Sequence, residues 1–385
     1  MKVIFQIIFL GFKLFLQPGR RLPILVFLLG CIQISTSSIA QEGKNYSFNI
    51  EPKVHYGFII PHRTGIKNLI KGHVKGFELN YDIPTFGEKK WQQLYHYPTW
   101  GFSFYFADLA NPLQLGFATG IFPYINFSTI KKDIFNLNFH LGWGVGYISK
   151  PFNRIENYKN IIIGSKINAI ISLGCEAEWK LTNRISASSG ISLTHFSNGA
   201  FTIPNLGINI PTANAGLSCY FGKVGKSLII DSVTAKNGKK EISYFAAGGL
   251  RAVYPLGSTE KYAAFSMGIT FALLSSVKNQ FLVGYDLFYN TAHYDYFKRA
   301  KIILKNQFEN LQPGISLFYA ARISRISIIT GMGYYIYSKY KQDGPVYHRI
   351  GMRYQVTENI FANVTLKTHF FKADFSEWGI GYCFH

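Results

Sequence analysis

Short segments of alternating apolar and polar residues run through this sequence, and they restrict the folds open to it. In the last segment, residues 375–384, every second residue is large and apolar: Trp378, Ile380, Tyr382 and Phe384. A period of two is typical of a β-strand with one apolar face. No segment after residue 40 approaches ~20 consecutive apolar residues, so no helical span is expected there. With 17% aromatic residues, the pattern predicts an all-β fold, a transmembrane antiparallel β-barrel whose closure satisfies its backbone hydrogen bonds in lipid.

Sixteen such segments are separated by turns, and each predicts a strand. They cover residues 46–61, 73–82, 97–108, 113–127, 132–148, 167–181, 184–198, 208–222, 241–254, 261–274, 278–290, 311–322, 324–337, 347–355, 359–370 and 375–384. Tight links lead from even to odd strands, and most longer links lead from odd to even strands. Because outer loops are the longer ones in bacterial barrels, the longer links are expected at the cell surface. Residues 83–96 and 223–240 are exceptions, long links on the periplasmic side.

The link at 223–240 leaves two architectures open: two tandem eight-stranded barrels, or one barrel of about sixteen strands with a periplasmic insertion. A short echo between residues 193–196 (LTHF) and 367–370 (KTHF) favours duplication. We therefore expect residues 41–223 to form one eight-strand unit, 224–240 a periplasmic link, and 241–385 a second eight-strand unit.

The N-terminal 40 residues predict a signal peptide. Arg20 and Arg21 precede the apolar run 22–34, and the small residues of 38–40 favour cleavage after Ala40. An alternative interpretation takes residues 28–31, ending in Cys31, as a lipoprotein box, but the apolar residues that follow argue against it.

Charge and cysteine content add little about chemistry. The formal charge of +20 fits a surface that meets anionic lipid phosphates, and it fits solvated lysines equally well. Nothing resembles a nucleic-acid module. Cys175, Cys219 and Cys383 are spread too widely for a disulfide framework, and none has metal-ligand spacing with another cysteine or a histidine. The sequence therefore predicts no metal and no cofactor.

Three polar residues stand out because they share the parity of lipid-facing positions. His195 and Ser197 continue the apolar face of the predicted strand 184–198, and Asn209 continues that of strand 208–222. Histidine and serine two residues apart on one face have Cα atoms about 7 Å apart, so the imidazole can remove the serine proton during attack on an acyl carbonyl. In this interpretation Asn209 orients the histidine, and Asn205 and backbone amides near Gly199 stabilise the oxyanion. The alternative is that these residues simply lie in the headgroup region, where polar groups are tolerated.

Residues 195–199 (HFSNG), followed by Pro204-Asn205-x-Gly207, resemble the signature of the lipid A 3-O-deacylase (PagL) family. These are eight-stranded outer-membrane barrels that hydrolyse the ester-linked acyl chain at position 3 of lipid A, and related proteins are described as acyloxyacyl hydrolases. The resemblance implies that Ser197 is the nucleophile, His195 the general base and Asn205 an oxyanion-hole residue, with Asn198 in support. It implies lipid A as the substrate and the outer membrane as the location, with the site near the outer-leaflet interface. It covers about 15 residues closely and residues 41–223 more loosely.

One position departs from the family pattern. The acid of the triad is expected where this chain has Asn209, and an amide can orient a histidine but cannot supply a full negative charge. Glu176 and Glu178, on the adjacent predicted strand, have lumenal parity. Two alternatives follow, a working Ser-His-Asn esterase or an inactive relative.

A rival hypothesis from another class is a non-catalytic barrel, which would be a porin, a transporter or a structural protein. Its oligomeric state is left open, as it is for the esterase. Among other polar residues, His369 is predicted to face the lumen, and Asp374 and Glu377 form an acid pair without an evident cleft.

Overall fold

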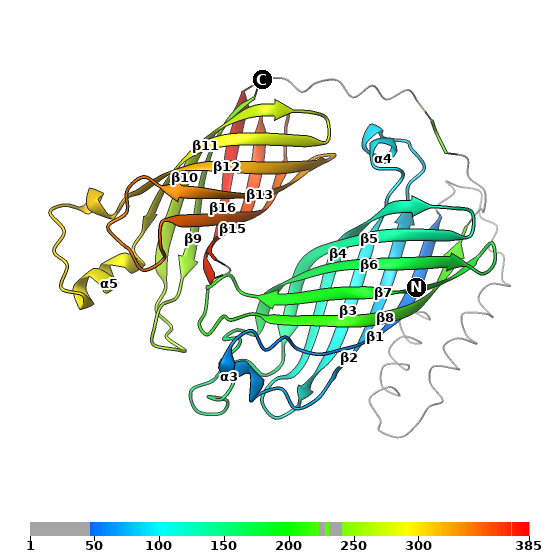
Figure 1. Cartoon of the computed structure of the whole chain (residues 1–385), viewed down its shortest axis with the longest axis horizontal. Coiled ribbons are helices and arrows are strands. Elements are labelled where there is room, and N and C mark those ends of the chain that lie inside the picture. Colours follow the sequence, from blue (N-terminus) through cyan, green and yellow to red (C-terminus); the bar gives the residue numbers. More distant parts are fainter. Residues whose placement is uncertain (1–46, 223–227, 231–240, 371, 385) are drawn as a thin grey trace.

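Two closed antiparallel β-barrels make up the described part of the chain (Figure 1). The structure is a computed structural model that describes residues 47–222, 228–230, 241–370 and 372–384. The predicted signal peptide and most of the link at 224–240 therefore lie outside the described residues. All eight strands of each barrel follow one another in sequence order, so every neighbour pair except the closing one is a simple hairpin.

The strands of the first barrel are β1 (Phe48–Gly57), β2 (Val74–Pro84), β3 (Thr99–Asn111), β4 (Gly116–Lys131), β5 (Phe135–Ile148), β6 (Ile167–Lys180), β7 (Ile185–Ser197) and β8 (Ile208–Phe221). The strands of the second barrel are β9 (Ile242–Arg251), β10 (Tyr262–Ser275), β11 (Asn279–Asn290), β12 (Gln312–Ile323), β13 (Ile326–Tyr335), β14 (Val346–Gln355), β15 (Ile360–His369) and β16 (Lys372–Phe384). Each predicted strand is present, with ends displaced by a few residues at most.

Strand pairing decides between the two architectures. β1 pairs with β8, with Val54 opposite Ala215, and β9 pairs with β16, with Ala246 opposite Ile380. Each barrel therefore closes after eight strands. The tandem architecture is confirmed, and the single sixteen-stranded barrel is wrong. Alternation along one strand does not specify which distant strand completes the ladder, so the sequence left both open.

The two faces of each barrel wall differ as the alternation predicts. Trp378 and Ile380 are 63% and 68% exposed on the outside, whereas Glu377, which precedes Trp378, is fully buried inside. Several lumenal charges form ion pairs: in the second barrel Arg349 Nε lies 2.7 Å from Glu377 Oε2, and Arg349 Nη1 lies 3.1 Å from Asp286 Oδ1. An apolar exterior around a filled, ion-paired interior fits a small barrel in a lipid bilayer.

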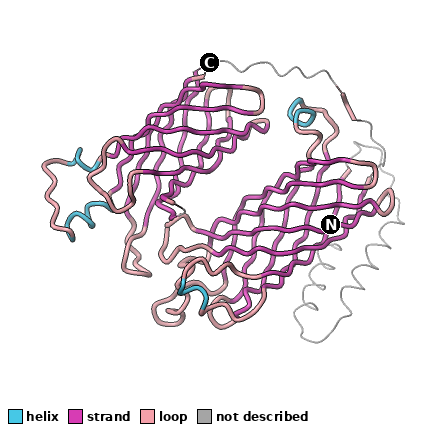
Figure 2. Tube along the Cα trace, in the orientation of Figure 1, coloured by secondary structure: helices cyan, strands magenta, loops and turns pink. Residues whose placement is uncertain are grey.

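Within the described residues, helices occur only in the links at the barrel ends, as Figure 2 shows. They are α3 (Thr64–Lys67), α4 (Lys90–Leu94), α5 (Ala292–Arg299) and the 3₁₀ helix η1 (Gln307–Asn310). None of the helices in the described ranges is long and apolar enough to cross a membrane. The alternation of apolar and polar residues did not predict these short helices, because they lie in the segments between strands.

Candidate active site

The candidate site lies where β7 ends and the link 198–207 begins. Phe196 is fully buried inside the barrel, and its neighbours His195 and Ser197 are half-buried on the outward face. His195 lies directly opposite Asn209 in the β7–β8 ladder. The period of two thus places the three predicted polar residues on one side of the wall.

Asn209 contacts two histidines. Its Oδ1 lies 2.6 Å from His195 Nδ1, and its Nδ2 lies 3.4 Å from His62 Nδ1. His62 Nε2 in turn lies 3.0 Å from the carbonyl oxygen of Leu206. His62 Nδ1 also lies 3.2 Å from the carbonyl oxygen of Ile60, so it accepts from the Asn209 amide only in the tautomer that carries its proton on Nε2. In that tautomer Asn209 Oδ1 is left to accept from His195 Nδ1. His195 Nε2 then carries the lone pair that a general base needs.

No pattern in the sequence distinguishes His62. It lies in the exposed link between β1 and β2, 147 positions from Asn209, and no periodicity marks it. Only the closure of β1 against β8 brings this link to the site.

The hydroxyl of Ser197 lies among groups of the following link. Asn205 Nδ2 donates to Ser197 Oγ at 3.0 Å, and the backbone N–H of Gly199 approaches the same oxygen at 3.3 Å. Asn205 Oδ1 accepts from the backbone N–H of Asn198 at 3.1 Å, which fixes the orientation of the amide. In the part of the chain that the structure describes, no hydrogen bond joins His195 to Ser197. The serine is held by the donors predicted for an oxyanion, and its bond to the base is not formed.

Backbone geometry in the link depends on glycine at two positions. Gly199 has φ +61° and Gly207 has φ +80°, in the left-handed region that side chains disfavour. A Cβ at Gly207 would lie 2.7 Å from His195 Cε1, so the backbone packs directly against the imidazole ring. Asn198 Nδ2 anchors the link by donating to Ser165 Oγ at 2.7 Å.

Neither alternative carboxylate reaches the histidine. Glu176 lies in the lumen, where it pairs with Lys53, and Glu178 accepts from Asn136 Nδ2 at 3.1 Å. Across the described ranges His195 has no ion pair with an acid. Among the described residues, the side chain that bonds His195 is therefore the amide of Asn209 and not a carboxylate.

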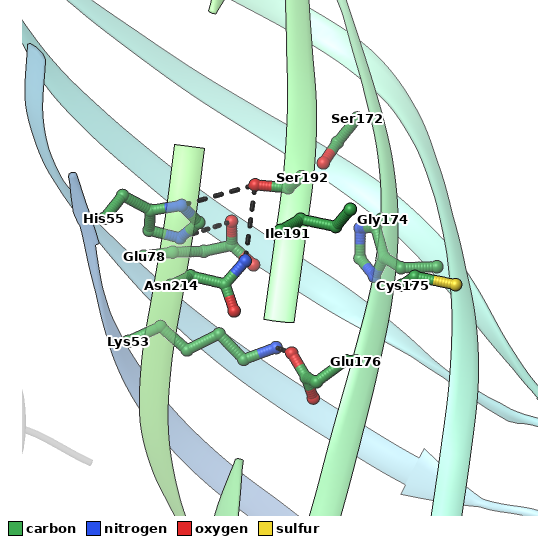
Figure 3. Close-up of a pocket in the computed structure, with 11 residues that line it drawn as sticks. Lys53, His55, Glu78, Ser172, Gly174, Cys175, Glu176, Ile191, Ser192 and Asn214 are labelled. Atoms are coloured by element: carbon green, nitrogen blue, oxygen red, sulfur yellow. Dashed lines mark hydrogen bonds and ion pairs between the residues drawn. The ribbon is translucent and has the colours of Figure 1, made fainter. Parts of the chain in front are cut away.

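A second serine–histidine–acid arrangement lies inside the first barrel (Figure 3). His55 Nε2 is 3.4 Å from Glu78 Oε2, and His55 Nδ1 is 3.5 Å from Ser192 Oγ. The cavity beside them has a volume of about 20 Å³, which is room for a water molecule and none for a lipid. Ser192 Oγ also shares a 2.8 Å bond with Thr212 Oγ1. This arrangement is best explained as part of the lumenal hydrogen-bond network.

The second barrel has a cluster of Asp343, His369 and Asp374 whose ligand atoms lie within 4.8 Å of one another. Cationic side chains already occupy its carboxylates. Lys367 Nζ lies 2.7 Å from Asp374 Oδ2, Arg251 Nη1 pairs with Asp374 Oδ1, and Lys372 Nζ lies 3.2 Å from Asp343 Oδ1. Three cations against two carboxylates fit an ion-pair network better than a metal site. His369 is buried in this lumen, as its parity predicts, and its Nε2 bonds Tyr335 Oη at 2.9 Å.

The fold and the matches to family models together indicate an outer-membrane β-barrel of the ester-hydrolase class. Residues 75–218 match the family model described as "Lipid A 3-O-deacylase (PagL)", and residues 240–385 match the one described as "Acyloxyacyl hydrolase, C-terminal domain". The first barrel is therefore similar to lipid A 3-O-deacylases, and the second barrel is similar to the C-terminal domain of acyloxyacyl hydrolases. The second match covers the half of the chain that the sequence motif did not reach.

The crystal structure of the outer membrane enzyme PagL is 16% identical to this chain in an alignment that covers 44% of this chain and 97% of PagL, with a TM-score of 0.29. Two mutant porins of Rhodopseudomonas blastica are each 8% identical, cover 88% of this chain and 99% of theirs, and give TM-scores of 0.17. A comparison with curated protein sequences gives no match.

Proposed function

We propose that the first barrel is a serine esterase that removes an ester-linked acyl chain from lipid A, using Ser197, His195 and Asn209 at the outer-leaflet interface. The observation that carries this proposal is the pair of bonds at the rim. Asn209 Oδ1 holds His195 Nδ1 at 2.6 Å, and Ser197 Oγ lies within reach of Asn205 Nδ2 and the Gly199 N–H. All of these groups lie at the outward end of one strand pair, where an acyl ester at the membrane surface can meet them.

The reaction follows from these positions. Ser197 Oγ attacks the ester carbonyl carbon while its proton passes to His195 Nε2. The carbonyl oxygen becomes an oxyanion that accepts hydrogen bonds from Gly199 N–H and Asn205 Nδ2. Collapse breaks the bond to the sugar oxygen, which leaves with the proton from His195. Water then attacks the acyl-serine and gives a proton to His195. His195 passes this proton to Ser197 Oγ as the bond between that oxygen and the acyl carbon breaks, which releases a fatty acid and free Ser197.

The bond between His195 and Ser197 has to form for the first step. Catalytic hydrogen bonds are often absent or long without substrate and shorten in the substrate complex. When a substrate carbonyl takes the donors Asn205 and Gly199, Ser197 Oγ loses those partners and is released towards the imidazole.

Asn209 supports the base by position and not by charge. A carboxylate in its place would stabilise the imidazolium that forms, and an amide does so more weakly. We therefore propose an active but slow esterase. His62 contributes by holding the Asn209 amide with its oxygen towards His195.

The test is lipid A mass spectrometry after purified protein is incubated with lipopolysaccharide. We expect wild type to release one acyl chain and Ser197→Ala to release none. Ser189→Ala is the matched control, since Ser189 lies on the same outward face of β7 and is exposed. Equal acylation patterns for wild type and Ser197→Ala would overturn the proposal.

A further inference from the structure

Contacts between the two barrels gather on the link that follows the nucleophile. At this end of the molecule the backbone N–H of Ala252 donates to the carbonyl of Ala200 at 2.9 Å, and that of Gly257 donates to the carbonyl of Ile203 at 3.0 Å. Both donors lie in the link between β9 and β10, and both acceptors lie in 198–207. The barrels lie side by side here (Figure 1), joined through backbone groups.

A lysine of the second barrel adds side-chain contacts to the same link. Lys261 Nζ lies 3.4 Å from Thr202 Oγ1 and 4.9 Å from the ring centre of Phe201. Arg154, in the link between β5 and β6, donates from Nε to the carbonyl of Leu256 at 2.8 Å. The β9–β10 link is therefore bonded to two neighbouring links of the first barrel.

The wall of the second barrel reaches Gly199 itself. A Cβ at Gly199 would overlap Ser376 Oγ and lie 3.3 Å from Leu366 Cδ1. Ser376 has the outward parity of Trp378 and Ile380, which are lipid-exposed, so an apolar residue would be expected at this position. Its small side chain leaves space for the backbone of the link at Gly199, and this contact explains why a small polar residue stands there.

A separate contact joins the barrels at their opposite ends. Tyr95 Oη donates to the carbonyl of Arg322 at 2.7 Å, and Lys278 Nζ lies 5.2 Å from the ring centre of Tyr95. Docking of the barrels thus does not depend on the 198–207 link alone. A variant at Tyr95 can therefore weaken the attachment of the barrels without changing the contacts of residues 198–207.

We propose that the second barrel positions the oxyanion donors of the first, through Ser376, the β9–β10 link and Lys261 acting on residues 199–203. This inference rests on the proposed function. Stabilisation of an oxyanion depends on donors fixed before the reaction, and an exposed link held only at its ends would be less well ordered. Ser376 and Lys261 are positioning residues, since neither touches the reacting atoms.

The experiment uses the full chain in detergent with lipopolysaccharide, measuring kcat and KM together with hydrogen–deuterium exchange of residues 199–205. Ser376→Phe pushes a ring into the space of Gly199, and Lys261→Met removes both contacts of the ammonium group. We expect each variant to lower kcat by about tenfold or more with little change in KM, since loss of one oxyanion donor lowers turnover by ~10²–10³. Exchange at 199–205 should become faster, and Lys261→Arg should restore most of the turnover.

Two controls isolate the effect. Ala362→Phe adds the same ring to the outward face of β15, four residues from Leu366, and Tyr95→Phe removes the inter-barrel bond at the other end. Both should keep wild-type kcat. Unchanged kcat in Ser376→Phe and Lys261→Met, with wild type active and Ser197→Ala inactive, overturns this inference alone. Equal activity of wild type and Ser197→Ala overturns the proposed function, and this inference with it.

Discussion

His195 Nδ1 and Asn209 Oδ1 lie 2.6 Å apart across the β7–β8 pair. The bond fixes the plane and tautomer of the imidazole, which is one of the two contributions of a triad acid. The other contribution, a negative charge beside the imidazolium, is missing. Asn209→Asp replaces the amide nitrogen with an oxygen, so it adds the negative charge while the bond to His195 Nδ1 is kept.

Asn209→Asp should raise kcat for lipid A by about tenfold or more. In a serine protease, replacing the aspartate of the triad by asparagine lowers turnover by about 10⁴, largely because the histidine then adopts the wrong tautomer. In this site the bond from Asn209 Oδ1 already fixes the tautomer of His195. The gain should therefore be smaller than this factor of about 10⁴. Steady-state release of fatty acid from lipopolysaccharide measures it, with Asn209→Leu as the variant that loses both contributions. Turnover in Asn209→Asp at or below wild type, with the barrel intact, would show that charge does not limit the reaction.

His62→Ala should lower kcat by about an order of magnitude and leave KM nearly unchanged. Without His62 Nδ1, the Asn209 amide can rotate and present Nδ2 to His195, which stabilises the wrong tautomer. His73→Ala is the control, a histidine in the same link that stacks on Tyr56.

The same substitution should have less effect in an Asn209→Asp background, because a carboxylate has two equivalent oxygens and needs no orientation. The coupling between the two positions is read from a double-mutant cycle. Additive effects of the two changes would contradict the orienting role of His62.

The alternation of single strands was sufficient to predict the fold class and all sixteen strands, because each strand has one face in lipid and one in a filled lumen. It also placed His195, Ser197 and Asn209 on one outward face. Closure after eight strands was not determined, since the Val54–Ala215 and Ala246–Ile380 pairs are long-range and leave no local mark.

The missed residues share one physical property: each acts through an element far away in sequence. His62 reaches Asn209 only because β1 closes on β8. Ser376 contacts Gly199 only because the barrels lie side by side. The sequence around a loop histidine, or around a serine on the apolar face of a strand, does not indicate which distant residue it contacts.

Gly207→Ala should lower turnover strongly and the free energy of unfolding only slightly. The new Cβ would lie 2.7 Å from His195 Cε1 and displace the ring, and a displacement of ~1 Å at a catalytic group can lower the rate by ~10². Left-handed backbone at an alanine adds about 1–2 kcal/mol of strain. Gly344→Ala is the matched control, with φ +73° and nothing within 4 Å of its Cβ. Both variants should show similar small losses in urea unfolding, and only Gly207→Ala should lose turnover. Similar turnover in the two would show that the ring tolerates the contact.

The link that carries α5 should loosen as pH falls. Burial lowers the pKa of His293 to about 4, although Asp374 and a 3.0 Å bond to Asn310 act in the opposite direction. The unfolded link binds a proton near pH 6.5, and the folded link does so only near pH 4. Its stability is therefore complete above about pH 6.5 and declines between there and pH 4. Hydrogen exchange of residues 292–310 at about pH 7 and pH 5, corrected for intrinsic rates, measures this. In His293→Asn the difference should disappear, and its persistence would assign the effect to another group.

Arg349→Met should destabilise the second barrel by about 3–5 kcal/mol, because it leaves two buried carboxylates without a cation. Arg349 is 2% exposed and pairs with both Asp286 and Glu377. The exposed Arg325, in the turn after β12, is the control, and Arg325→Met should change the urea midpoint little.

The triple variant Arg349→Met, Asp286→Asn, Glu377→Gln distinguishes the loss of an attractive pair from the burial of unpaired charge. Neutral amides still accept from Tyr347 Oη and Thr365 Oγ1, which bond these carboxylates at 2.7 and 2.6 Å. Removing both signs of charge together should recover most of the stability, since a buried ion pair contributes little net free energy compared with neutral groups of similar size. A triple variant as unstable as Arg349→Met would mean that the arginine acts by packing, against Phe245 and Phe288, whose ring centres lie 4.9 and 5.2 Å from its guanidinium carbon.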